Sequence, residues 1–218
     1  MRTFRLPARS AVATLLLGFP LASTLGLWPA RADGPPDVVK VQEDWELVIG
    51  DADTLREAPQ VVCAMAPRPV DDGVYALLEI NHQNLPSYQS GGLQLQVWSG
   101  DELLGYKDDE RSELLGQVGE VITWTQEMTA QHCGLKFRVL NGNSGTWGEF
   151  APDGSLAVDG GQGADDLNGY SPDFSVSRSG VSYGAKRVQS FTLKRVRLYS
   201  SQGLIAEDDT PRSVQLAP

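Results

Sequence analysis

The chain has 218 residues and a formal net charge of −10, from 18 basic and 28 acidic side chains. This acidic balance argues against binding to nucleic acid and to anionic membranes, because both depend on clustered Lys and Arg. The length fits a single domain with a proper core.

Residues 1–32 have the three-part layout of a secretory signal peptide. Three arginines within the first nine residues precede a largely apolar stretch over 11–27, and Ala30-Arg31-Ala32 has small residues suited to cleavage. A membrane-spanning helix needs ~20 predominantly apolar residues, so we expect cleavage after Ala32 rather than a retained anchor. The mature chain is then a secreted, periplasmic or cell-envelope protein without a membrane span, and its oligomeric state is left open.

After a short lead at 33–42, residues 43–204 consist of short segments in which apolar side chains occupy every second position. In chain order, the aligned apolar positions are Trp45, Leu47 and Ile49; Val61, Cys63 and Met65; Leu93, Leu95 and Val97; Ile122 and Trp124; Leu135, Phe137 and Val139; and Phe191, Leu193, Val196 and Leu198. A period of two is typical of strands with one buried face. The parity changes near Lys194-Arg195, which predicts a β-bulge there.

No segment shows a sustained helical period, and turns are marked by Asn141-Gly142, Asp153-Gly154 and Asn168-Gly169. We expect long loops with short strands over 151–189 and a loosely ordered tail at 205–218. Many short strands separated by turns predict an all-β fold, an antiparallel β-sandwich of the jelly-roll type in one domain.

The two cysteines are Cys63 and Cys133. Export would place them where disulfides persist, so we expect one bridge between them. The alternative is two buried free thiols.

Three blocks, Gly91 to Trp98, Leu135 to Phe150 and Val188 to Tyr199, resemble strands of the concanavalin A-like sandwich shared by lectins, laminin-G modules and glucanases. The resemblance covers residues 43–200 at the level of architecture, and the blocks are also similar to exported bacterial proteins without an assigned activity. A fold of this type implies glycan binding as an expectation only, because fold does not define function.

Trp98 shares a strand face with Gln94 and Gln96, opposite the apolar positions. An aromatic ring flanked by amides is suited to stacking on a sugar and bonding its hydroxyl groups. Trp124 and Trp147 could contribute from neighbouring strands, although large aromatics are mostly buried. We therefore favour a non-catalytic binding module with a carbohydrate ligand.

Two other functions stay open. The segment from Glu110 to Leu114 resembles the Arg-Ser-Glu-Leu strand of jelly-roll alginate lyases, which implies Arg111 and Glu113 as candidate catalytic residues of a polysaccharide lyase or glycoside hydrolase. The His and Tyr blocks of those lyases and the acidic strand of laminarinases are missing, so no acid or base is assigned. The third reading is a structural cell-envelope protein without a small ligand.

The stretch from Gly160 to Leu167 matches one copy of a calcium-binding nonapeptide. Hard oxygen donors for Ca²⁺ are available at Asp159, Asp165, Asp166 and Asn168. A single copy supplies half of the usual ligand set, so a flexible acidic loop is the competing interpretation.

Overall fold

The computed structural model describes residues 35–69, 73–82, 91–132, 134–161 and 164–216. They belong to one compact unit that begins at Pro35. The predicted signal peptide lies outside the described residues. No helix among these residues is long and apolar enough to cross a membrane.

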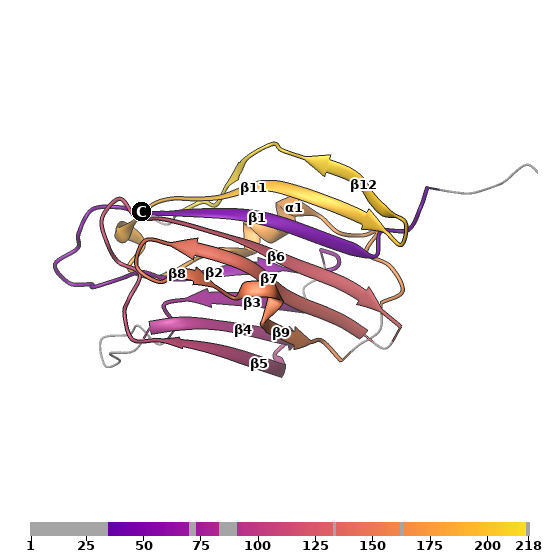
Figure 1. The fold of residues 1–218 in the computed structure, drawn as a ribbon, viewed down its shortest axis with the longest axis horizontal. Helices are drawn as coiled ribbons and strands as arrows, with labels where there is room; N and C mark the ends of the chain where they lie inside the picture. Colours follow the sequence, from indigo (N-terminus) through magenta and orange to yellow (C-terminus); the bar gives the residue numbers. More distant parts are fainter. Residues whose placement is uncertain (1–34, 70–72, 83–90, 133, 162–163, 217–218) are drawn as a thin grey trace, which may run out of the picture. The chain divides into compact units, whose positions relative to one another are not determined.

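The larger sheet has eight strands, and all of its pairings are antiparallel. Its main order is β12 (Gly203–Asp208), β11 (Val188–Ser200), β1 (Lys40–Ile49), β6 (Val121–Gln131), β7 (Gly134–Ser144) and β8 (Gly148–Phe150). Two further strands pair beside this path, β13 (Arg212–Ser213) with β11 and β9 (Leu156–Asp159) with β7. Figure 1 shows β11, β1, β6 and β7 side by side at the front of the molecule.

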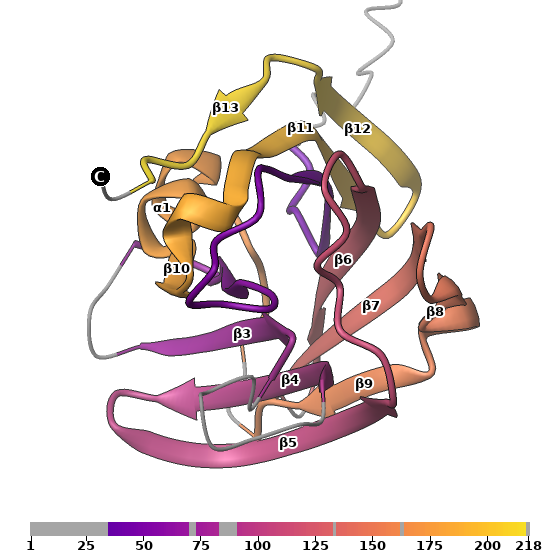
Figure 2. The ribbon, with the colours of Figure 1, turned by 90° about the vertical axis from the view of Figure 1, so that its left-hand side faces the viewer.

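The smaller sheet is also antiparallel and has five strands. Their order is β10 (Gly180–Tyr183), β2 (Gln60–Met65), β3 (Val74–Ile80), β4 (Gly91–Ser99) and β5 (Glu102–Arg111). The helix α1 (Pro172–Arg178) packs beside β2, and Figure 2 shows it next to β10. Single turns of 3₁₀ helix occur at η1 (Pro152–Gly154) and η2 (Ala185–Arg187).

The two sheets pack face to face around one apolar core, which confirms the predicted all-β sandwich. The alternating positions expected to be apolar are buried, as in the run of Leu93, Leu95 and Val97, except for Leu198, which is half-buried. At the centre, Trp45 stacks on Trp124 with ring centroids 6.3 Å apart. The jelly-roll assignment stays a prediction.

Two bulges change which side chains face outward. In β11 the pairing with β1 shifts between Leu193 and Arg195, so the bulge predicted near Lys194 is confirmed. In β7 the pairing with β6 shifts between Val139 and Asn141. The prediction of a turn at Asn141-Gly142 is wrong, because both residues lie within this strand. The other two dipeptides do lie in turns.

Three local predictions differ from the structure. The tail expected to be loosely ordered from residue 205 instead supplies β12 and β13, because their backbones pair with β11. The region 151–189, expected to contain loops and short strands, includes the helix α1. Its seven residues are too few to show a helical period in the sequence. Cys63 is a buried free thiol, so the predicted bridge is not formed at this residue; Cys133 lies outside the described residues.

Candidate functional site

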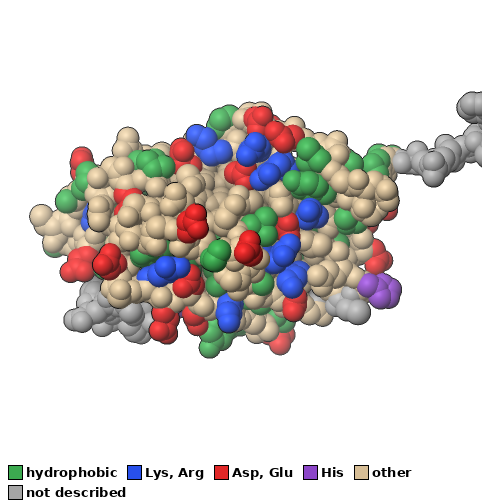
Figure 3. Space-filling model, viewed as in Figure 1, with side chains coloured by type: hydrophobic (Ala, Val, Ile, Leu, Met, Phe, Trp, Pro, Cys, Tyr) green, Lys and Arg blue, Asp and Glu red, His purple; other side chains and the backbone are tan. Residues whose placement is uncertain are grey.

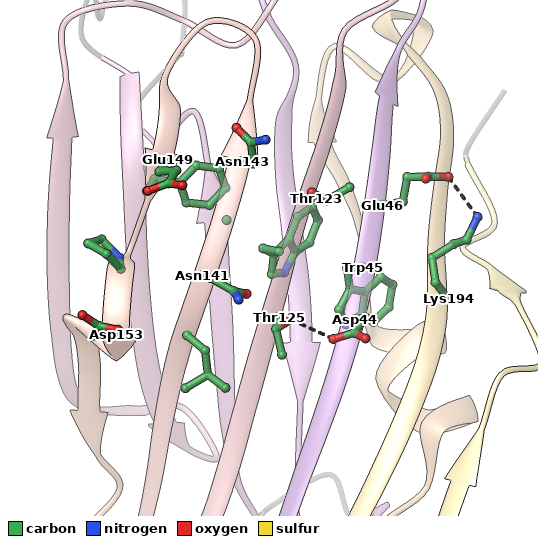
Figure 4. A pocket seen from close by; sticks show the side chains of 15 residues that line it. Asp44, Trp45, Glu46, Thr123, Thr125, Asn141, Asn143, Glu149, Asp153 and Lys194 are labelled. Carbon is green, nitrogen blue, oxygen red and sulfur yellow. Dashed lines mark hydrogen bonds and ion pairs between the residues drawn. The ribbon is translucent and has the colours of Figure 1, made fainter.

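The outer face of the larger sheet carries a hollow of about 550 Å³, which we call the groove (Figure 4). The polar side chains that line it come from β1, β6, β7, β8, η1 and β11. They are Asp44, Glu46, Thr123, Thr125, Asn141, Asn143, Glu149, Asp153 and Lys194. The groove is therefore a polar surface on rigid strands, without a loop covering it among the lining residues.

Strand pairing arranges these side chains in two rows across the sheet. Glu46 pairs with Thr123, which pairs with Asn143, which pairs with Glu149. The second row contains Asp44, Thr125 and Asn141. Neighbouring strands lie ~4.8 Å apart, and residues two apart on one strand face the same way. The groove thus presents hydrogen-bonding groups at regular intervals in both directions.

On the flank of the groove formed by β1 and β11, the side chains are already hydrogen-bonded to one another. The carboxylate of Asp44 accepts hydrogen bonds from Thr125 Oγ1, Arg195 Nε and Arg197 Nη2, each at 2.7 Å. This carboxylate raises the pKa of Arg195 above its usual value. Asp44 therefore has little remaining capacity to bind a ligand.

Farther along this face, the carboxylate of Glu127 is also occupied by internal hydrogen bonds. Its carboxylate accepts bonds from Arg138 and from Gln42 Nε2, the latter at 2.8 Å. Burial alone would raise the pKa of Glu127, but the bonds from Arg138 and Gln42 outweigh it and hold the pKa below its usual value. Tyr199 in turn donates to Gln42 Oε1 at 2.8 Å. This part of the face is a closed network.

The middle and the far flank of the groove are different. Five of its polar side chains have no hydrogen bond or ion pair with any residue that the structure describes: Thr123, Asn141, Asn143, Glu149 and Asp153. Trp124, which borders the groove from the core, is 2% exposed, and its buried indole N–H has no partner among the described residues and is out of reach of a ligand. Unused donors and acceptors in a hollow are free to bind a polar ligand.

Charge is also unevenly placed over this face. Figure 3 shows basic side chains gathered over part of the surface, with isolated acidic groups on the uncharged surface beside them. Within the groove, Lys194 is paired with Glu46 at 3.2 Å. Glu149 and Asp153 have no such partner among the described residues.

The site predicted at Gln94, Gln96 and Trp98 lies on the smaller sheet instead. These three side chains share its outer face as expected, but they bond to one another. Trp98 Nε1 donates to Gln96 Oε1 at 2.8 Å, Gln96 donates to Gln94, and Gln94 Nε2 donates to Asp108 at 2.6 Å. Gln96 is only 8% exposed. The two amides that were expected to bind a sugar are therefore already hydrogen-bonded to neighbouring side chains.

A second hollow of about 450 Å³ begins one strand away from these residues. It is lined by Tyr75 and Leu77, the pairing partners of Trp98 and Gln96, and by Phe174 and Arg178 of α1. Apolar side chains of β2 and the carboxylate of Asp101 also line it, so its surface is mixed in polarity.

The candidate lyase residues make local contacts. Arg111 Nη2 binds Asp109 Oδ2 at 2.6 Å, and its guanidinium lies 5.7 Å from the ring centroid of Trp147. Trp147 in turn donates to the backbone carbonyl of Glu113 at 2.7 Å. Catalysis by Arg111 and Glu113 stays a prediction.

The proposed calcium ligands are not brought together. In the described part of the chain, no group of three acidic, His or Cys side chains is placed to hold a metal ion. Asn168 instead anchors the N-terminal segment, accepting a bond from Val38 N and donating one to Asp37, both at 2.9 Å. Of the other candidates, Asp166 accepts from Asn168 N, and Asp159 and Asp165 have no side-chain bond to another described residue. Hydrogen bonds of Asn168 and Asp166 hold this part of the loop, and calcium binding there stays a prediction.

Sequence patterning missed Asn141 and Asn143 because it placed a turn at Asn141. Strict alternation after Val139 would also have pointed Asn141 inward, and the bulge at Leu140 reverses this. The only signal available was the polar run from Asn141 to Asn143 directly after an apolar strand.

Comparison with known proteins does not assign the chain to a family. No protein-family model matches it, and no curated protein matches it. Its function has to be inferred from the site.

Proposed function

We propose that this chain is a non-catalytic binding protein that holds an oligosaccharide in the groove. The observation that carries the proposal is the pair of amides of Asn141 and Asn143, which have no partner among the described residues and lie in a hollow beside a network of internal bonds. Sugar hydroxyl groups both donate and accept hydrogen bonds, and an amide side chain offers both functions.

The two rows of side chains support a ligand that is extended rather than compact. An oligosaccharide lying across the strands meets Thr123 and Asn143 in one row and Asn141 in the next. Positions on strands keep their geometry better than positions on loops, which favours such pre-formed binding. Cleavage of a signal peptide at 1–32 would place this binding outside the cytoplasm.

Replacing both Asn141 and Asn143 by alanine is expected to weaken glycan binding by about tenfold. Each neutral hydrogen bond contributes ~1 kcal/mol, and part of it is recovered by water. Titration calorimetry with β-1,4-linked glucose, N-acetylglucosamine and glucosamine hexamers measures the affinity of the full-length chain. Both asparagines are exposed, so the fold should survive their truncation.

Gln94→Ala is the matched control, because it truncates an amide on the outer face of the other sheet. It should leave the affinity unchanged. Loss of binding in Gln94→Ala, with none in the double asparagine variant, would place the site on the smaller sheet. Absence of binding to every hexamer would favour the structural cell-envelope role.

A further inference from the structure

We infer that the groove selects glycans that carry free amino groups over neutral glycans and over uronic acids. This inference rests on the proposed function and adds the ligand class. It follows from the balance of charges in the groove after internal pairing has been taken into account.

The groove contains four carboxylates and one ammonium group among its lining residues. On the flank formed by β1 and β11, the charges are matched. Asp44 faces Arg195 and Arg197, and Glu46 faces Lys194. This flank offers no free charge to a ligand.

The opposite flank carries two carboxylates that form no ion pair among the described residues. Figure 4 shows Glu149 and Asp153 on the far side of Asn141 and Asn143 from this matched flank. Glu149 lies on β8 directly opposite Asn143, and Asp153 lies in η1. Neither has a cationic partner within the described residues. A sugar that bonds to the asparagines therefore lies beside two free carboxylates.

An ammonium group on such a sugar gains two attractive contacts. A hydroxyl group at the same position gains only neutral hydrogen bonds, and an N-acetyl group has no charge. A uronate meets repulsion, because Lys194, the one cation among the described lining residues, is held by Glu46 at 3.2 Å. Both carboxylates are exposed, so the preference is modest and sensitive to salt.

The test compares three β-1,4-linked hexamers that share a backbone and differ at one substituent: glucosamine, N-acetylglucosamine and glucose. We expect the full-length chain to bind the glucosamine hexamer about tenfold more tightly than the glucose hexamer at low salt. A tri- to hexa-uronate mixture should bind most weakly. Raising the salt to 0.5 M should remove most of the difference.

The double variant Glu149→Gln, Asp153→Asn should bring the glucosamine and glucose affinities together. The charge-matched control is Asp51→Asn, Glu102→Gln, which neutralises two exposed acids outside the groove and should keep the preference. Equal affinities for the two hexamers in the unmodified chain, or a preference that survives Glu149→Gln, Asp153→Asn, overturn this inference. In either case the Asn141, Asn143 variant still reports separately on whether the groove binds glycans.

Discussion

Replacing Arg187 by alanine should lower the free energy of unfolding by about 3 kcal/mol. Arg187 is 4% exposed and lies in η2. Its guanidinium donates to the carbonyl oxygens of Arg56, Glu57 and Gly116, which belong to two different loops at this end of the sandwich. Truncation leaves these acceptors without a donor in a site that water does not reach freely.

Denaturant unfolding of the alanine variant measures this loss. Arg187→Lys should recover little of it, because a single ammonium group cannot span carbonyl groups in both loops. The exposed neighbour Lys186 is the control, and Lys186→Ala should change stability by no more than about 0.5 kcal/mol. If Arg187→Ala were as mild as Lys186→Ala, Arg187 would not hold the loops together.

The second large effect concerns Glu43, a carboxylate at 0% exposure between the sheets. It accepts hydrogen bonds from Trp45 Nε1 at 2.8 Å, Gln126 Nε2 at 2.6 Å and Tyr170 OH at 2.6 Å. Glu43→Leu removes the acceptor of Trp45, Gln126 and Tyr170, of which only Gln126 keeps another bond, a longer one to the carbonyl of Ala64 at 3.4 Å, and it should cost about 3 kcal/mol. Glu43→Gln keeps the shape and one acceptor oxygen, so it should cost clearly less.

The pH dependence provides a separate test of Glu43. Burial raises the pKa of its carboxyl above the usual 4.5, and the hydrogen bonds from Tyr170, Trp45 and Gln126 offset this only in part. The folded state therefore binds this proton more tightly than the unfolded state. Its contribution to stability is fully present below pH 4.5 and is lost as the pH rises through the folded pKa.

Unfolding free energies of the unmodified chain and of Glu43→Gln, measured between pH 4 and pH 8, isolate this contribution. The unmodified chain should lose stability relative to the variant as the pH rises. Parallel curves would show that the pKa of Glu43 is the same in the folded and unfolded states.

Patterning predicted the strands because each has one face in the core. Leu93, Leu95 and Val97 have the same surroundings whichever strands lie beside them, so alternation alone identifies their buried face. The bulge at Lys194 was visible for the same reason, as a break in that alternation. Glu43, in contrast, is an acid at an inward position, and its partners Gln126 and Tyr170 lie far away in the chain.

The amino-acid sequence by itself determined the all-β class, the sandwich and the outward face of Gln94, Gln96 and Trp98, because these follow from local periodicity. Only the tertiary structure decided which polar faces are free to bind. The glutamines bond to one another and Asp44 to two arginines, whereas Asn141 and Asn143 have no partner in the part of the chain that the structure describes. Whether a polar side chain has a partner depends on strand register and bulges between distant segments, and no single strand contains that information.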